Sequence, residues 1–128
     1  MTSAPGTAAE DLVAGRLVAA GWRVLGVRVR TAREELDVVA VDPGPPEALV
    51  VVEVRWRGRR DFGLPEESLD RRKRLAMRRA IAALLDATVL PDGTRLPHAP
   101  LRVDLVVVEP PARAGEGPRV RHHRGIAL

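Results

Sequence analysis

The sequence predicts a single α/β domain in which helices pack on one mixed sheet of antiparallel and parallel strands. Three observations lead to this fold class. The 128 residues are 45% hydrophobic, as in ordinary globular domains. The expected elements follow the order helix, three strands, long helix, strand. Short links between the first strands favour an antiparallel meander, and the long helix before the fourth strand favours a right-handed parallel crossover.

The first half of the chain is expected to hold one helix and three strands. Residues 8 to about 20 repeat leucine and valine at helical spacing. Residues 22–30 are rich in valine and alternate in their second half, which is typical of a strand. Residues 35–42 and 48–56 give the second and third strands, and PGPPE between them is a turn.

The second half is expected to add a long helix and a central strand. The helix is predicted from about Glu66 to Asp86, because Pro65 suits a helix start. After a proline-rich loop, the segment from Leu101 to Glu109 is apolar enough to lie in the middle of a sheet. Residues 119–128 are expected to add a short edge strand.

Composition excludes several classes of protein. The chain has no cysteine, so it can form neither a disulfide framework nor a thiolate zinc site. No apolar run approaches about 20 residues and the N-terminus lacks the pattern of a signal peptide, so a soluble cytoplasmic protein without membrane contact is expected. Residues 1–128 are interpreted as one domain, with flexible segments at residues 1–7 and 110–118.

Arginine is concentrated in two stretches. The chain has 21 basic and 17 acidic residues, and Lys73 is its only lysine. Four of the six residues from Arg55 to Arg60 are arginine, and five arginines and Lys73 lie among the nine positions from Arg71 to Arg79. Such clusters favour a polyanionic partner, in the first place DNA, although a solvated helix face has the same composition. The residues expected to contact nucleic acid are Arg57, Arg59, Arg60, Arg71, Arg72, Lys73 and Arg74.

The third predicted strand carries two charges beside an apolar run. Glu53 and Arg55 are two residues apart, so they point to the same face of the strand. If the hairpin folds symmetrically about Pro45, the numbers of opposed residues sum to 90. Asp37 then lies opposite Glu53 and Glu35 lies opposite Arg55, with all four side chains on one face.

Two carboxylates at that spacing repel each other and raise each other's pKa. A divalent cation at Asp37 and Glu53 is the simplest compensation, because Mg²⁺ or Mn²⁺ held by carboxylates can polarise a phosphodiester and lower the pKa of a bound water. Arg55 would then stabilise the charge that develops on phosphorus. These are the parts of a metal-dependent nuclease. The structural alternative is a cross-strand salt bridge between Glu35 and Arg55 at the end of the sheet.

The order of short motifs along the chain resembles a known family. A glutamate in the first helix is followed by ELD, VVEVR, FG-x-P, a long helix with one lysine, and RVDLVVV. This order resembles the YraN-like family of small bacterial proteins over nearly the whole chain, from Gly6 to His123. That family is similar to archaeal Holliday-junction resolvases and has a restriction-endonuclease-like fold. The resemblance implies a Mg²⁺-dependent endonuclease or phosphodiesterase that acts on nucleic acid, and a homodimer.

By position, the resemblance also implies roles for individual residues. Glu10 matches the glutamate of the first helix, where a carboxylate would also favour the helix dipole. Asp37, Glu53 and Arg55 match the acidic strand and the E-x-K element. The implied catalytic set is therefore Glu10, Asp37, Glu53 and Arg55, with Asp37 and Glu53 as the metal ligands. The further matches are Glu35, Phe62, Gly63, Pro65, Lys73 and Asp104, of which Glu35 and Asp104 would support the site.

The chain departs from the family pattern at four positions. Ala9 and Glu34 replace glycines, and Arg28 replaces an asparagine. The lysine of the E-x-K element is Arg55, which stays charged and cannot act as a base but can still hold phosphate. A catalytically inactive nucleic-acid-binding or scaffold module is therefore the alternative. An interaction domain without a nucleic-acid role is a third interpretation.

Other polar and aromatic side chains are interpreted as structural. Asp104 interrupts an apolar strand, where a hydrogen-bonding role is favoured over metal ligation. His122 and His123 are adjacent and would face opposite sides of a strand, so no joint metal site is expected. Trp22 and Trp56 are expected to pack in the core or on the surface rather than to stack on bases.

Overall fold

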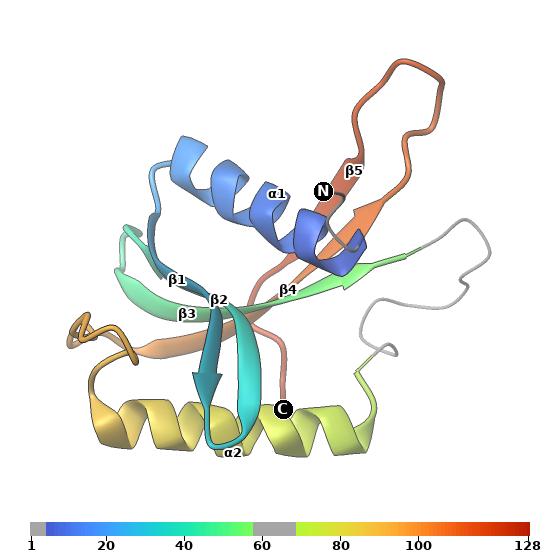
Figure 1. Cartoon of the computed structure of the whole chain (residues 1–128). Helices are drawn as coiled ribbons and strands as arrows, with labels where there is room; N and C mark the ends of the chain where they lie inside the picture. The colour runs from blue at the N-terminus through green and yellow to red at the C-terminus, as the bar shows by residue number, and fades with distance from the viewer. Residues whose placement is uncertain (1–4, 58–68) are drawn as a thin grey trace.

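Two helices cover opposite faces of one five-stranded sheet (Figure 1). The computed structural model describes residues 5–57 and 69–128. Helix α1 (Pro5–Ala19) lies on one face, and helix α2 (Arg71–Ala87) lies on the other. Within the described ranges no helix is long and apolar enough to cross a membrane. The predicted order of helices and strands and the mixed sheet are confirmed.

The strands lie in the sheet in the same order as in the sequence. All neighbouring pairs are antiparallel except β3 and β4, which are parallel because α2 connects them. The expected edge strand at the C-terminal end is present as β5. The bounds are β1 (Arg23–Thr31), β2 (Glu34–Asp42), β3 (Ala48–Trp56), β4 (Leu101–Glu109) and β5 (Arg119–His123).

The central strands separate two apolar cores. In β3, Val50 and Val52 pack toward α1, whereas Leu49 and Val51 pack toward α2. A strand that is covered on both faces needs apolar residues at every position rather than at alternate ones. This explains why β3 reads as a continuous apolar run up to Glu53, which is the last buried residue of the strand.

The symmetric register of the predicted hairpin is confirmed. β2 and β3 pair from Asp42 with Ala48 to Val38 with Val52, and the residue numbers of every pair sum to 90. Two cis peptide bonds, at Pro45 and Pro46, lie in the turn. The next position along this register brings Asp37 and Glu53 to the same end of the two strands.

The start of α2 differs from the prediction. The helix begins at Arg71 rather than near Glu66, because Asp70 is its N-cap and accepts a hydrogen bond from the Lys73 amide at 2.8 Å. Pro65, on which the predicted start rested, lies outside the described residues. Helix α1 starts at Pro5, three residues earlier than expected, with proline in the first turn where its missing N–H costs nothing.

Candidate active site

Glu53 is a buried carboxylate at the end of an otherwise apolar strand. Its side chain is only 4% exposed, and two cations approach its Oε2 atom. Arg55 Nη2 lies at 3.3 Å and Lys73 Nζ at 3.4 Å. Glu53 and Arg55 therefore share a face as predicted, and the partner that closes the site from α2 is the only lysine of the chain.

Asp37 is the second carboxylate of this site. The Val54 amide donates a hydrogen bond to Asp37 Oδ2 at 2.8 Å, which fixes the side chain at the end of β3. Burial raises the pKa of Asp37 to about 8, the neighbouring Glu53 carboxyl adds to the rise, and the Val54 amide and Lys73 oppose it. Near neutral pH Asp37 therefore keeps its proton.

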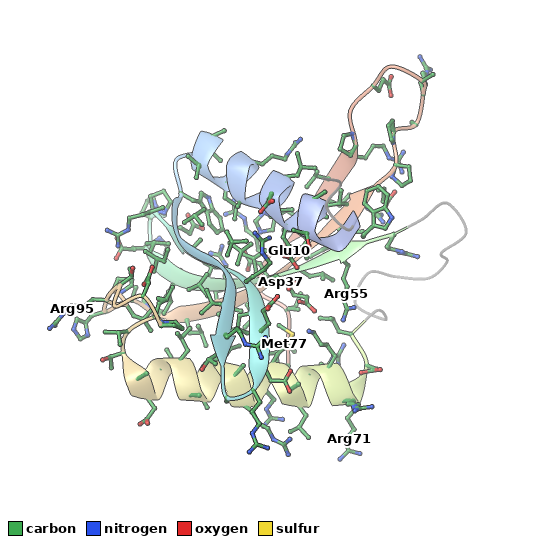
Figure 2. The ribbon with its side chains drawn as sticks, in the orientation of Figure 1. Glu10, Asp37, Arg55, Arg71, Met77 and Arg95 are labelled. Atoms are coloured by element: carbon green, nitrogen blue, oxygen red, sulfur yellow. The ribbon has the colours of Figure 1, made fainter. Side chains whose placement is uncertain are left out.

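Glu10 brings a third acid from α1. Its pKa is raised by burial, a rise that Arg28 opposes and nearby Asp37 reinforces. Arg28 Nη1 lies 3.0 Å from Glu10 Oε2 and 3.0 Å from Asp11 Oδ1. Figure 2 shows Glu10 and Asp37 near the centre of the molecule, with Arg55 beyond them on β3. Three acids thus run from α1 to β3, with Arg28 at one end and the two cations of Glu53 at the other.

The sequence grouped Lys73 with the outer arginines as a nucleic-acid contact and did not indicate its contact with Glu53. Met77, Ala80, Ile81 and Leu84 form the buried stripe of α2, and Lys73 lies one turn before Met77 on the same stripe. That spacing could have predicted that Lys73 faces the sheet. Lys73 is also the only lysine in a chain whose other basic residues are arginines, which indicated a special position for it. Arg28 was noted only as a departure from the family pattern, and its contact with Glu10 was also missed.

Glu35 does not join the site, and the predicted opposition of Glu35 and Arg55 is wrong. Glu35 pairs with Arg30 of β1, whose Nη1 lies 3.9 Å from Glu35 Oε2. Alternation breaks just before the site, because Leu36 packs toward α2 whereas Val38, two residues later, packs toward α1. The face of Glu35 therefore cannot be predicted by counting alternate residues from Glu53 across the hairpin.

Asp104 is buried on the opposite face of the sheet. It pairs with Val52 and is fully buried, and it accepts hydrogen bonds from Arg102 and from the Gly125 amide. His122 Nε2 lies 2.8 Å from Asp104 Oδ2. Burial alone would raise the pKa of Asp104, but the His122 and Arg102 contacts outweigh it and lower the pKa to about 2. These contacts agree with a structural role.

The two adjacent histidines face opposite sides of the sheet, as expected. His122 contacts Asp104 on the side of α1, whereas His123 lines a cavity of about 420 Å³ with Leu69 and Arg74 on the side of α2. The two imidazole rings therefore do not point into a common site.

The predicted nucleic-acid contacts divide into three groups. Arg71 and Arg72 are exposed at the start of α2, as a contact with phosphates requires, whereas Arg57 and Arg74 are half-buried. Arg59 and Arg60 lie outside the described residues, as do Phe62 and Gly63. One further cation was missed. Arg121 of β5 shares a row of the sheet with Arg55, through Val107 between them.

The donor set fits a cation that takes only part of its coordination shell from protein. Across the described part of the chain, no group of three or more His, Asp or Glu side chains is placed to hold a metal ion. Mg²⁺ usually binds through one or two carboxylates and completes its octahedron with waters and phosphate oxygens. Asp37 and Glu53 would offer two such carboxylates once Asp37 has lost its proton.

Comparison with known proteins gives consistent matches along the chain. Residues 9–108 match the model of the uncharacterised protein family UPF0102, a range that holds Glu10, Asp37, Glu53 and Lys73. A UPF0102 protein of Symbiobacterium thermophilum is 36% identical over 110 residues, which cover 86% of each chain. One of Roseiflexus castenholzii is 37% identical over 107 residues, 84% of this chain and 80% of the relative. One of Moorella thermoacetica is 40% identical over 80 residues, 62% of this chain and 64% of the relative.

Proposed function

This chain belongs to the uncharacterised protein family UPF0102, and we propose that it is a nucleic-acid-binding phosphodiesterase, an endonuclease that depends on Mg²⁺ or Mn²⁺. One observation carries the proposal. Two acid groups are held together at a strand end, and the only lysine of the chain lies 3.4 Å from one of them. In a purely structural ion pair Glu53 alone faces both cations, and a second buried acid beside it adds desolvation and repulsion.

Asp37 and Glu53 would hold the cation, which would supply a Lewis acid for the phosphodiester and lower the pKa of a bound water. Asp37 would lose its proton to solvent on binding the cation, since a carboxylate ligand must be ionised. Glu10 lies next to Asp37 and would hold a water beside the metal ligands. The contact of Glu10 with Arg28 keeps its carboxylate oriented toward the site.

Arg55 and Lys73 would act on the phosphate. Both now lie against the same oxygen of Glu53, so a cation on Glu53 would release them toward an approaching anion. The planar guanidinium of Arg55 suits two phosphate oxygens at once. Lys73 supplies the compact ammonium that Arg55 does not, and it would stabilise the developing charge or orient the attacking water. Lys73, which matches the lysine of the family's long helix, would thus provide the ammonium group that the E-x-K element lacks in this chain.

The surrounding cations support a phosphate backbone as the ligand. Arg121 extends the row of Arg55 across the sheet, and Arg71 and Arg72 are exposed at the start of the helix that carries Lys73. Contacts of this kind fix the position of a strand and read no sequence.

Cleavage of labelled branched, single-stranded and duplex DNA in Mg²⁺ or Mn²⁺ tests the proposal. Asp37→Asn and Glu53→Gln should abolish cleavage, and Lys73→Ala should reduce it by about 10²-fold or more. Arg95→Ala is the matched control, because Arg95 is an exposed cation on the far side of the molecule (Figure 2) and should leave cleavage unchanged. Equal activity of the wild type and Glu53→Gln would contradict the proposal.

A catalytically inactive nucleic-acid-binding module is the second candidate, and Arg55 in place of lysine favours it. The same assay separates the two functions when Arg55→Lys is included. No cleavage by either the wild type or Arg55→Lys, with salt-sensitive DNA binding intact, would establish the binding module.

A further inference from the structure

Arg28 is held in a backbone conformation that arginine rarely adopts. Its φ is +52° inside strand β1, in the left-handed region, where the Cβ atom of an L-residue comes too close to a carbonyl oxygen. Glycine and asparagine tolerate this region far better than arginine does. A strained residue that persists inside a strand needs contacts that hold it there.

These contacts come from the first helix. Arg28 Nη1 donates hydrogen bonds to Glu10 Oε2 at 3.0 Å and to Asp11 Oδ1 at 3.0 Å. Glu10 is the inner partner, since 15% of its side chain is exposed compared with 57% for Asp11. A guanidinium that bridges an inner and an outer carboxylate of one helix fixes the position of the inner one.

The left-handed residue also lies at the point where the sheet loses its alternation. Val29 pairs with Leu36 in the antiparallel register of β1 and β2, which places Arg28 opposite Asp37. A left-handed residue interrupts the alternation of a strand, as it does in a β-bulge. On the opposite strand the alternation is interrupted at the same point, because Leu36 packs toward α2 and Val38 packs toward α1.

Glu10 lies beside the two proposed metal ligands without joining them. Its carboxyl group is close enough to Asp37 to interact with it. Across residues 5–57 and 69–128, however, no three His, Asp or Glu side chains are placed to hold a metal ion together. Glu10 directs its Oε2 atom to Arg28 instead.

We propose that Arg28 is a positioning residue that keeps Glu10 out of the coordination shell of the cation, so that the site holds the ion with two carboxylates and not with three. The inference rests on the proposed function and specifies how the same site limits its hold on the cation. An ion with two carboxylate ligands keeps waters and positions for phosphate oxygens, which the proposed reaction needs. Glu10 then acts on a water beside the metal ligands.

Loss of the guanidinium should have two effects on the cation. Glu10 would be free to turn to the ion as a third carboxylate, and ligand charge count is a main determinant of affinity at such sites. Removal of a positive charge near the ion also favours binding, but by long-range attraction that solvent and salt screen.

Mn²⁺ binding, measured by calorimetric titration near pH 7 in the absence of DNA, tests the inference. Arg28→Asn removes the guanidinium and tolerates the left-handed conformation, and it should bind Mn²⁺ about tenfold more tightly than the wild type. Arg30→Asn is the matched control, because Arg30 lies on the same strand and contacts Glu35, a carboxylate outside the site, at 3.9 Å. It loses the same charge and should change the affinity by no more than about twofold.

A double-mutant cycle separates the release of Glu10 from the loss of charge. In Glu10→Gln, which keeps the size of the side chain without its charge, Arg28→Asn should change Mn²⁺ affinity by no more than about twofold. Equal tightening in both backgrounds would show that Arg28 acts through its charge alone, and would overturn the positioning role.

Urea unfolding of a second variant tests the strain at Arg28. Arg28→Val also lacks the guanidinium, but its β-branched side chain is poorly suited to the left-handed region. Its unfolding midpoint should therefore be lower than that of Arg28→Asn. Equal midpoints would overturn the assignment of backbone strain to this position.

The outcomes separate this inference from the proposed function. If the wild type binds Mn²⁺ and Arg28→Asn binds it equally or more weakly, the role of Arg28 is overturned and the cation site stands. Absence of saturable binding in the wild type and in Arg28→Asn alike overturns the proposed cation site together with this inference.

Discussion

Asp37 links protonation to stability at the scale of single residues. Its pKa rises from 3.8 to about 8 in the folded protein, so the folded state holds a proton that the unfolded state has lost between these values. The stabilisation is fully present below about pH 4 and is lost as the pH rises through about 8. Between about pH 5 and pH 8 the wild type should lose on the order of a few kcal/mol of unfolding free energy relative to Asp37→Asn.

Urea unfolding of the two proteins across that pH range measures the difference. Asp86→Asn, a change in a carboxylate of α2 outside the site, should keep the wild-type slope of stability against pH. The same slope in Asp37→Asn and the wild type would show that Asp37 is not the group that holds the proton.

Asp104 should stabilise the fold without serving the site. Asp104→Asn removes a fully buried charge that faces Arg102 and His122, and leaves the Arg102 guanidinium without its main partner. We expect a loss of about 2–4 kcal/mol in unfolding free energy, measured in urea. Asp92→Asn, at an exposed turn carboxylate, should cost less than about 1 kcal/mol. Loss of cleavage in folded Asp104→Asn would instead place Asp104 in the chemistry.

The sequence allowed some of these side chains to be placed but not others. The shared face of Glu53 and Arg55 follows from alternation in one strand, and the approach of Asp37 follows from a symmetric turn. The face of Asp104 could not be derived, because the register of the parallel pair β3–β4 is set by packing of the connecting helix and not by a turn. Lys73 could have been placed from the stripe of α2.

At the scale of elements, the N-cap of α2 fixes the first turn of the helix, which carries Lys73. Asp70 accepts a hydrogen bond from the Lys73 amide, so the cap and the site residue belong to the same first turn. Asp70→Ala should cost about 1 kcal/mol of unfolding free energy. Asp86→Ala, near the other end of α2, should be neutral or slightly stabilising because a carboxylate near a C-terminus opposes the helix dipole. Equal losses in the two variants would argue against the cap.

The predicted helix start failed because two start signals compete in this stretch. Proline in a first turn favoured residue 65, whereas Asp70 offers a side chain that bonds the amide three residues later. Only the backbone conformation at residue 70 decides between them. The irregular register of β1, which shifts between Val24 and Gly26, also lacks a signal in sequence pattern alone.

At the scale of the whole molecule, the order of elements was sufficient to predict the mixed sheet, because short links impose antiparallel pairing and a helical crossover imposes a parallel pair. The separation of the acid site from the Asp104 network could not be predicted in this way. It depends on which face each strand presents to each helix.

The distribution of charge gives a prediction about salt. A net charge of +4 is modest, but Arg121 shares a row of the sheet with Arg55, and Arg71 and Arg72 are exposed at the start of the helix that carries Lys73. Affinity for single-stranded DNA should fall steeply with salt, and the double variant Arg71→Ala, Arg72→Ala should reduce the log–log slope by about 1.4, from about 0.7 per lost phosphate contact. Binding isotherms between 50 and 200 mM salt measure it. An unchanged slope would show that the start of α2 does not contact the DNA. Arg95→Ala is the control and should keep the wild-type slope.

The central claim is that Asp37 and Glu53 form a cation site rather than a structural ion pair, and calorimetric titration with Mn²⁺ in two buffers of different ionisation enthalpy tests it most directly. We predict saturable binding near pH 7 with release of about one proton per ion, because Asp37 holds a proton that the metal must displace. Glu53→Gln should abolish the binding, whereas Asp86→Asn should not affect it. Absence of saturable binding in the wild type, or binding that persists in Glu53→Gln, would contradict the claim.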